Sequence, residues 1–234
     1  MAQDKVVVVA GVGPGNGAAL AKRFAGEGRR IAMLARSRDR ADALAAEIEG
    51  ARGYACDVGD KASVKACFAA IAAELGEIGT LLFNAGTGVF ADVEHITPEQ
   101  FEASWRVNAL GLFLCSREVI PAMKAAGEGN IVVIGATASR RGGKATAAFA
   151  PAKAAQRSLA ESMARSLWPA GIHVALIIVD GAVDLPTTRA KMPDKADDFF
   201  VGPEGVAEIA WDLTRQSRRA WSFEVEARPY GESW

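Results

Sequence analysis

Short runs of β-branched and other apolar residues alternate with longer stretches of helical composition along the whole chain. Continuous apolar runs that end at a turn are typical of strands covered on both faces. We expect strands at residues 5–10, 29–35, 53–58, 79–86, 130–136, 171–179 and 221–227, and helices at 18–28, 41–48, 63–75, 98–126, 147–167 and 203–216. Gly111 and Pro121 are expected to bend or divide the longest helix. The alternation predicts an α/β fold, a single-domain doubly wound parallel sheet of about seven strands with helices on both faces.

A glycine-rich turn lies between the first expected strand and the first expected helix. Asn16 occupies the last place of the usual G-x-G-x-x-G pattern, and the spacing found is G-x-x-x-G-x-G. Glycines let the backbone approach a pyrophosphate, which then lies at the positive end of the helix. The position between strand and helix therefore predicts a dinucleotide site rather than a purely structural turn. Its residues are Gly11, Gly13, Pro14, Gly15, Asn16 and Gly17.

Further motifs follow in order along the chain. They are Cys56-Asp57-Val58, Asn84-Ala85-Gly86, Asn108, Lys153 and Asp180-Gly181. This ordered set resembles the short-chain dehydrogenase/reductase family over nearly the whole chain. The resemblance implies a Rossmann-like fold, a single nucleotide-binding domain over residues 1–234, oxidoreductase activity on a small-molecule substrate, and a homodimer or homotetramer. It also implies that Asp57 contacts adenine and that Asn108 helps to hold a water chain. The cofactor positions that it adds are Asp57, Val58, Asn84, Ala85, Gly86, Lys153, Gly181 and Val183.

The residues after the second expected strand favour NADP(H). An acid at this place binds the ribose 2′-hydroxyl of NAD, whereas an arginine accommodates the 2′-phosphate of NADP. Residues 34–38 read Leu-Ala-Arg-Ser-Arg and contain no carboxylate. We predict Arg36 as the main phosphate contact, with Ser37 beside it. The alternative is that Arg36 is a solvated charge, because Asp39 and Asp42 follow closely.

The expected active site departs from the family pattern. Where the family has Tyr-x-x-x-Lys, this chain has Phe149 four residues before Lys153, and the family's serine position is Ala136, with Thr137 next to it. We therefore take Lys153, Asn108, Phe149, Ala136 and Thr137 as the catalytic positions. A positioned acid or base contributes roughly 10²–10⁴ in rate. Its loss leaves room for catalysis, because holding hydride donor and acceptor together contributes more.

Three functions fit this pattern. The first is an NADPH-dependent oxidoreductase acting on an apolar C=N or conjugated C=C group that needs no tyrosine proton, with a later proton from water, Thr137, Ser139 or Asp180. The second is a slow carbonyl reductase with water as the acid. The third is a catalytically degenerate NADP(H)-binding sensor or scaffold. For Asp180, a turn residue bonded to its own backbone is the preferred interpretation.

Composition and charge exclude other classes. The formal net charge is −1, so no bulk attraction to nucleic acid or to an anionic membrane is expected. The three cysteines form no CxxC pair and the two histidines lie far apart, which argues against a disulfide framework and a metal site. No apolar stretch approaches the roughly 20 residues of a membrane span. The first residues lack a secretory leader, so a cytoplasmic location is expected.

Two segments outside the motifs carry further predictions. Residues 184–202 are polar and contain two prolines, a composition that suits a substrate-covering lid as well as a plain surface loop. Tyr230 and Trp234 are candidate anchors of a subunit interface, because aromatic residues concentrate in interface cores. The alternative is that they close the chain's own sheet.

Overall fold

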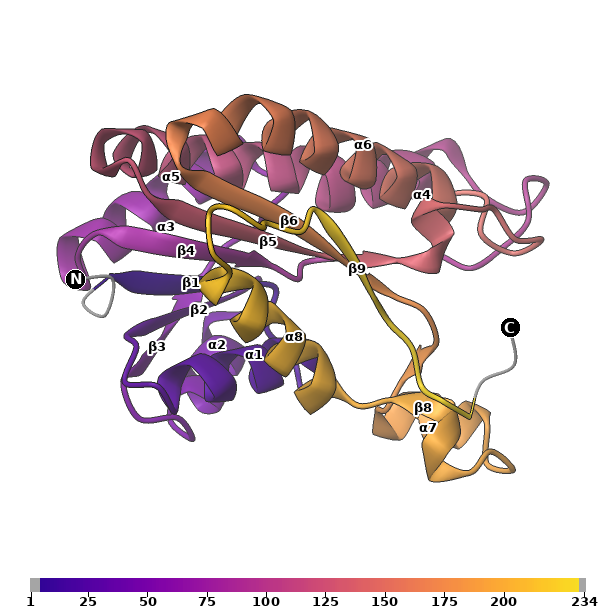
Figure 1. The fold of residues 1–234 in the computed structure, drawn as a ribbon. Coiled ribbons are helices and arrows are strands. Elements are labelled where there is room, and N and C mark those ends of the chain that lie inside the picture. The colour runs from indigo at the N-terminus through magenta and orange to yellow at the C-terminus, as the bar shows by residue number, and fades with distance from the viewer. Residues whose placement is uncertain (1–4, 232–234) are drawn as a thin grey trace.

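The computed structural model describes residues 5–231 and contains one seven-stranded parallel sheet (Figure 1). The strand order is β3-β2-β1-β4-β5-β6-β9. The strands are β1 Val6–Ala10, β2 Ile31–Ala35, β3 Ala51–Ala55, β4 Ile78–Phe83, β5 Gly129–Ala136, β6 Ile172–Val179 and β9 Glu224–Ala227. The chain winds outward from β1 to β3 and then crosses back to β4. This reversal leaves a crevice at the carboxyl ends of β1 and β4, where ligands bind in open α/β sheets.

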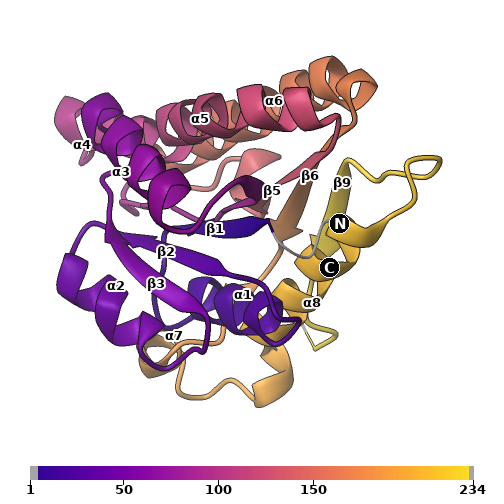
Figure 2. The same ribbon diagram turned by 90° about the vertical axis from the view of Figure 1, so that its left-hand side faces the viewer.

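Helices cover both faces of the sheet, which confirms the predicted fold class. Figure 2 shows α3, α5 and α6 on one side and α1, α2 and α8 on the other. The helices are α1 Asn16–Ala25, α2 Arg38–Ala45, α3 Lys61–Glu74, α4 Pro98–Trp105, α5 Gly111–Ala126, α6 Phe149–Leu167, α7 Pro186–Lys191 and α8 Pro203–Arg215. None of the described helices is long and apolar enough to cross a membrane.

The two apolar cores explain the continuous apolar run of the first strand. Val6 and Val8 point into the core beneath α3, α5 and α6, and Val7 and Val9 point into the core beneath α1 and α8. All four side chains are fully buried. Alternate residues of a strand face opposite sides of a sheet, so a strand covered on both sides has no position for a polar residue.

The third strand lies earlier in the chain than residues 53–58. It pairs in parallel with β2 from Ala51 to Ala55, and the ladder ends where β2 ends at Ala35. Cys56, Asp57 and Val58 therefore follow the strand instead of belonging to it. This places Asp57 at the carboxyl edge of the sheet, near the crevice.

The long helical region divides at a π-helical turn. Arg106–Leu110 form this turn between α4 and α5, immediately before Gly111. Pro121 was expected to bend or divide the region, but it lies inside the continuous helix α5. The break falls at the π-turn because its wider bonding interrupts the α-helical ladder. Thr97 begins α4 with a capping box, and Pro98 occupies the first turn.

The segment predicted as a lid or loop is folded in this structure. Two short strands, β7 Ala182–Val183 just before the segment and β8 Phe200–Val201 within it, pair in parallel and flank α7. Arg189 holds the segment together through ion pairs with Asp184 at 2.5 Å and Asp197 at 2.6 Å. Whether the segment moves as a lid remains a prediction.

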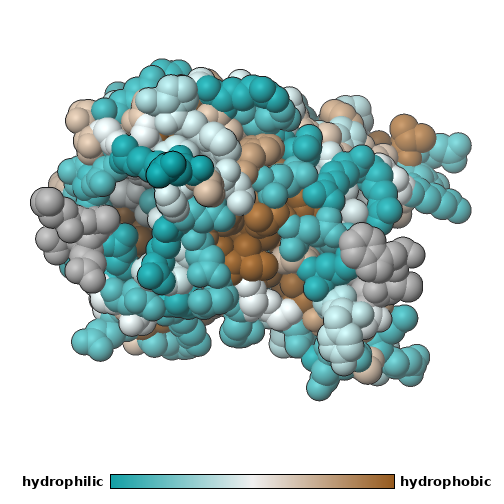
Figure 3. All heavy atoms as spheres, in the orientation of Figure 1, coloured by the Kyte–Doolittle hydropathy of each residue, from teal (hydrophilic) through white to brown (hydrophobic). Residues whose placement is uncertain are grey.

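Near the C-terminus, Tyr230 is 90% exposed and so does not close the chain's own sheet. Trp234 lies outside the described residues. β9 is the outermost strand on its side of the sheet. Figure 3 shows a mostly hydrophilic surface on this face, with an apolar area between β9 and α8.

Candidate active site

A cleft of about 890 Å³ lies where the chain reverses between β1 and β4. Nearly all of the predicted cofactor positions line it, from residues 11–86 and from β7. They are Gly11, Gly13, Pro14, Gly15, Asn16, Gly17, Arg36, Ser37, Asp57, Val58, Asn84, Ala85, Gly86 and Val183. Gly181 and Lys153 are not part of this lining. Sequence reasoning missed further lining residues, among them Arg40, Cys56, Thr87 and Leu185.

The glycine turn is packed so closely that side chains would not fit at two of its positions. Gly11 has a φ of +90°, and a Cβ atom there would lie 2.4 Å from the Cα of Ala85. A Cβ atom at Gly17 would lie 2.7 Å from the carbonyl oxygen of Gly11. The side-chain amide of Asn84 donates to that same oxygen at 2.6 Å. The turn is thus fixed against the end of β4, while Gly13 has open space at its Cβ position.

The first turn of α1 offers free hydrogen-bond donors to the cleft. Gly15 is the N-cap and provides no side-chain cap, and no acidic residue lies in the first turn. The first backbone N–H groups of a helix have no partner within the helix and attract anions. Among the described residues, nothing bonds the buried Oδ1 of Asn16. A dinucleotide fits this cradle, because its diphosphate accepts from free N–H groups and its ribose hydroxyls are donors for Asn16 Oδ1.

Two arginines reach the cleft beside the N-terminus of α2. Ser37 caps this helix by accepting from the backbone N–H of Arg40 at 3.3 Å. Arg36 and Arg40 both line the cleft, and within residues 5–231 neither guanidinium forms an ion pair. Arg38, by contrast, pairs with Asp42 at 2.7 Å. The second guanidinium at the cleft is therefore Arg40 and not Arg38. Arg40 lies three residues after the N-cap Ser37, so both residues face the same side of the first turn of α2. This spacing could have indicated that Arg40 reaches the cleft.

Asp57 lines the cleft just after β3, the strand next to β2. Its Oδ1 accepts from the backbone N–H of Gly59 at 2.9 Å, and its own N–H donates to Ser63 Oγ at 2.9 Å. Its side chain is exposed, so the carboxylate keeps acceptor positions for a ligand.

Lys153 and Asn108 meet beside Gly86, a residue that lines the cleft. A Cβ atom at Gly86 would lie 3.2 Å from Asn108 Oδ1 and 3.6 Å from Lys153 Nζ. The Asn108 amide donates to the carbonyl oxygens of Thr87 at 2.9 Å and Ser104 at 2.8 Å. Among the described residues its buried Oδ1 has no donor. Burial lowers the pKa of Lys153 to about 8, because water no longer solvates the ammonium ion.

An aromatic pair occupies the place next to this lysine. Phe149 is the first residue of α6, and its ring centre lies 5.9 Å from Lys153 Nζ. The ring of Phe90, which is 66% exposed, packs against it at 5.2 Å between centroids. This part of the site therefore presents apolar rings and no hydroxyl group.

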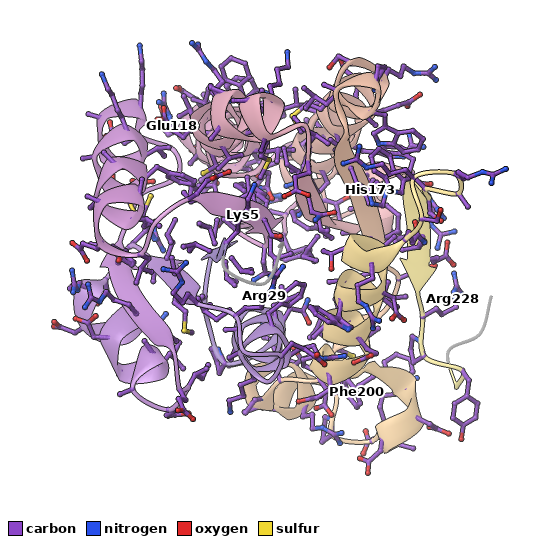
Figure 4. All side chains as sticks on the ribbon, turned by 60° about the vertical axis from the view of Figure 1, so that its left-hand side comes forward. Lys5, Arg29, Glu118, His173, Phe200 and Arg228 are labelled. Atoms are coloured by element: carbon purple, nitrogen blue, oxygen red, sulfur yellow. The ribbon has the colours of Figure 1, made fainter. Side chains whose placement is uncertain are left out.

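Thr137 and Asp180 belong to a partly buried polar network. Ala136 ends β5, and the hydroxyl of Thr137 donates to the carboxylate of Asp180. Asp180 also forms an ion pair with Arg228. Arg228 follows β9 (Figure 4). Burial would raise the pKa of Asp180, but the Thr137 hydrogen bond and the Arg228 charge hold this pKa below its ordinary value.

Two of the suggested proton sources do not fit this geometry. Asp180 is ionised at neutral pH, so it does not donate a proton. It is also not the self-bonded turn residue that we expected, because its carboxylate contacts Thr137 and Arg228. Ser139 donates to the carbonyl oxygen of Ala136 at 2.7 Å.

Fold and cleft together define a dinucleotide-binding α/β protein, and comparisons with known proteins narrow this class. The chain matches the family model described as short chain dehydrogenase over residues 5–196. 2-(R)-Hydroxypropyl-CoM dehydrogenase of Xanthobacter autotrophicus is 34% identical, over 84% of this chain and 82% of that protein. D-threitol dehydrogenase of Mycolicibacterium smegmatis is 40% identical, over 55% of this chain and 51% of that protein.

Solved structures share the fold over nearly the whole chain. A short-chain dehydrogenase from Rhodopseudomonas palustris is 35% identical with a TM-score of 0.83, covering 97% of this chain and 99% of that chain. A metagenomic short-chain oxidoreductase in complex with NADP is 26% identical with a TM-score of 0.84, covering 98% and 99%. The chain belongs to the short-chain dehydrogenase family. It is therefore an oxidoreductase of the type that binds a nicotinamide dinucleotide and acts on small molecules.

Proposed function

We propose that this protein is an NADPH-dependent reductase that transfers hydride to an apolar C=O, C=N or conjugated C=C group. The observation that carries the proposal is the convergence of Lys153 and Asn108 on Gly86, at the wall of the nucleotide cleft. A buried ammonium ion is costly, and such groups cluster where a ligand uses them.

The preference for NADP(H) rests on charge. Arg36 and Arg40 line the cleft without ion-pair partners among the described residues, and Ser37 lies between them. A positive charge in the first turn of a helix is unfavourable unless an anion lies nearby, and Arg40 lies in the first turn of α2. A 2′-phosphate supplies that anion, and an arginine matches it with two hydrogen bonds.

Each remaining part of the cleft has a role in this proposal. When bound, NADPH supplies the hydride. The glycine turn and the α1 N-terminus hold the diphosphate, and Asp57 and Val58 hold the adenine end. The nicotinamide half is enclosed by Asn84, Ala85, Gly86, Gly181 and Val183. There Lys153 donates hydrogen bonds to ribose hydroxyls, and Asn108 Oδ1 accepts a hydrogen bond.

The substrate must work without a phenol at position 149. We propose that Phe149 stands at the place of the family's acid and packs against the substrate together with Phe90. The missing acid raises the barrier by about 3–5 kcal/mol for a simple ketone. A C=N group protonated in advance, or an enone whose hydride adduct is protonated by water, avoids most of this cost. Thr137 does not supply the proton, because its hydroxyl hydrogen is committed to Asp180.

The test is NADPH consumption with a panel of ketones, quinones, enones and cyclic imines, with Lys153→Ala run in parallel. Turnover that the variant loses is the expected result. Turnover of imines or enones above ketones would support the role given to Phe149. NADPH binding without turnover of any class would count against a reductase and in favour of a nucleotide sensor.

The fold also bears on two expectations about the whole protein. We propose that residues 184–202 close over bound nucleotide, because Leu185 packs 2.6 Å from the position of a Cβ atom at Gly15.

We further propose a homodimer or homotetramer, supported by the sheet edge at β9 and its adjoining apolar area (Figure 3). Light scattering that gives a monomer at micromolar concentration would contradict the oligomer.

A further inference from the structure

Gln156 is a fully buried polar residue that the proposed chemistry does not use. It lies one turn after Lys153 on α6, so both side chains share one face of the helix. Its Oε1 accepts from Lys153 Nζ at 3.0 Å, and its Nε2 donates to the main-chain carbonyl of Asn108 at 3.0 Å. Burial of an amide is tolerated only when both ends are bonded, and here both are.

The direction of these bonds is fixed. Reversing the amide would place its NH₂ group against the ammonium of Lys153 and its oxygen against the carbonyl of Asn108, and both contacts are unfavourable. Lys153 donates a second bond to the carbonyl of Ile134 at 3.0 Å. The ammonium ion is therefore held by β5 on one side and by Gln156 on the other, which leaves its third N–H beside Gly86.

Asn108 is held in a similar way from both sides. It is the middle residue of the π-turn Arg106–Leu110, and its side chain donates to Thr87 and Ser104. Its main-chain carbonyl faces α6 and accepts from Gln156. One amide thus links Lys153 and Asn108, the two polar groups that meet beside Gly86.

We propose that Gln156 is a positioning residue that holds Lys153 toward the nucleotide by tying it to the π-turn at Asn108. The inference rests on the proposed function in so far as Lys153 contacts the nucleotide. An amide neither gains nor loses a proton at neutral pH, so this link orients Lys153 without relaying protons. Gln156 also provides the neutral acceptor that keeps a buried ammonium ion charged.

The surroundings of the ammonium contain no competing charge. Its pKa is lowered to about 8 by burial, and no charged or titratable group among the described residues contributes. The groups near Nζ are the Ile134 carbonyl, the Gln156 amide, the Phe149 ring and Gly86. A change at position 156 therefore acts on the charge of Lys153 directly.

The experiment measures the dissociation constant of NADPH from pH 6.5 to 10 for wild type, Gln156→Leu and Gln156→Glu. In wild type the affinity falls above about pH 8, where Lys153 loses its proton. Gln156→Leu removes an acceptor from the ammonium ion. The pH above which NADPH affinity falls, called the break below, therefore moves lower, and binding at pH 7 weakens about tenfold. Gln156→Glu places a carboxylate beside the ammonium, so the break moves up by about one pH unit or more.

Two controls separate positioning from packing. Gln216→Leu makes the same chemical change at the end of α8, where Gln216 bonds Ser222, and should leave the profile unchanged. Lys153→Met removes the break, and Lys153→Met/Gln156→Leu should bind no more weakly than Lys153→Met within about twofold. The inference would be overturned if the two substitutions weakened NADPH binding additively in the double variant. It would also be overturned if the pH profiles of both Gln156 variants matched that of wild type.

A readout without nucleotide keeps this test separate from the proposed function. The difference in denaturation midpoint between wild type and Lys153→Met, followed against pH, reports the titration of Lys153, and Gln156→Glu should move that titration upward. Wild-type protein that binds no NADPH would refute the proposed function, and this second titration would still decide the role of Gln156.

Discussion

At the scale of single residues, the proposed preference for NADP(H) rests on Arg36 and Arg40, which line the cleft and form no ion pair within residues 5–231. Arg36→Asp should weaken NADPH binding about 10- to 100-fold and leave NADH binding nearly unchanged, because charge-assisted hydrogen bonds to phosphate contribute roughly 1.5–3 kcal/mol. Arg38→Asp is the matched control, since Arg38 faces Asp42 and does not line the cleft. Fluorescence titration with both nucleotides makes the comparison. Equal losses for NADPH and NADH would refute the assignment.

Lys153 gives a second prediction at this scale. Its folded-state pKa of about 8 lies below the ordinary lysine value, so the charged form is destabilised by burial. This cost is fully present below about pH 8 and disappears as the pH rises through 8 toward the unfolded-state value. Lys153→Met should therefore stabilise the fold by on the order of 1–3 kcal/mol at pH 7, and by little at pH 10. Urea denaturation at both pH values measures the difference, with the exposed Lys65→Met as control. A less stable variant at pH 7 would contradict this account.

At the scale of elements, the position of α1 depends on the absence of a side chain at Gly17. A methyl group there would lie 2.7 Å from Gly11 O and 2.8 Å from Val12 Cα, both backbone atoms. Gly17→Ala should shift the helix and cost about 1–3 kcal/mol of stability. Gly13→Ala, with nothing within 4 Å of its Cβ position, should change stability little. Thermal unfolding without nucleotide compares the two, and equal melting temperatures would show that the turn relaxes freely.

At the scale of the whole molecule, Glu224 joins the last strand to the rest of the fold. It pairs with Arg157 of α6 at 2.6 Å and with Arg140 at 2.8 Å. Burial would raise the pKa of Glu224, but the two arginines outweigh it and lower this pKa. The resulting stability is present above the ordinary glutamate pKa and is lost as the pH falls through the lowered value.

Glu224→Gln should therefore cost about 1 kcal/mol at pH 7, and the difference should shrink below about pH 4. Glu161→Gln is the control, because the ion pairs of Glu161 with described residues all lie within α6. Denaturation midpoints at pH 7 and at about pH 2, below the lowered pKa of Glu224, measure both. A difference that persists at the lower pH would point to packing and not to charge.

The periodicity of the chain was enough to predict the sheet, its parallel direction and the helices on both faces. A strand buried on both sides needs a continuous apolar run, and the glycine turn that follows β1 has a fixed local conformation. These are local constraints, so residues such as Gly11, Arg36 and Asp57 were found from the sequence, and their positions line the cleft. The ends of elements were predicted less accurately than the elements themselves. The end of β3, for example, depends on where its neighbour β2 ends.

Only the tertiary structure decided how side chains from distant elements share partners. Arg38 forms an ion pair with Asp42, whereas Arg40 does not. The charged carboxylate of Asp180 forms an ion pair with Arg228, which lies beyond β9. The bridge from Lys153 through Gln156 to Asn108 spans two helices and a π-turn. Sequence spacing fixes which residues share a helix face. Hydrogen bonds across elements depend on distances of a few tenths of an ångström, and these are set only when both cores close around the sheet.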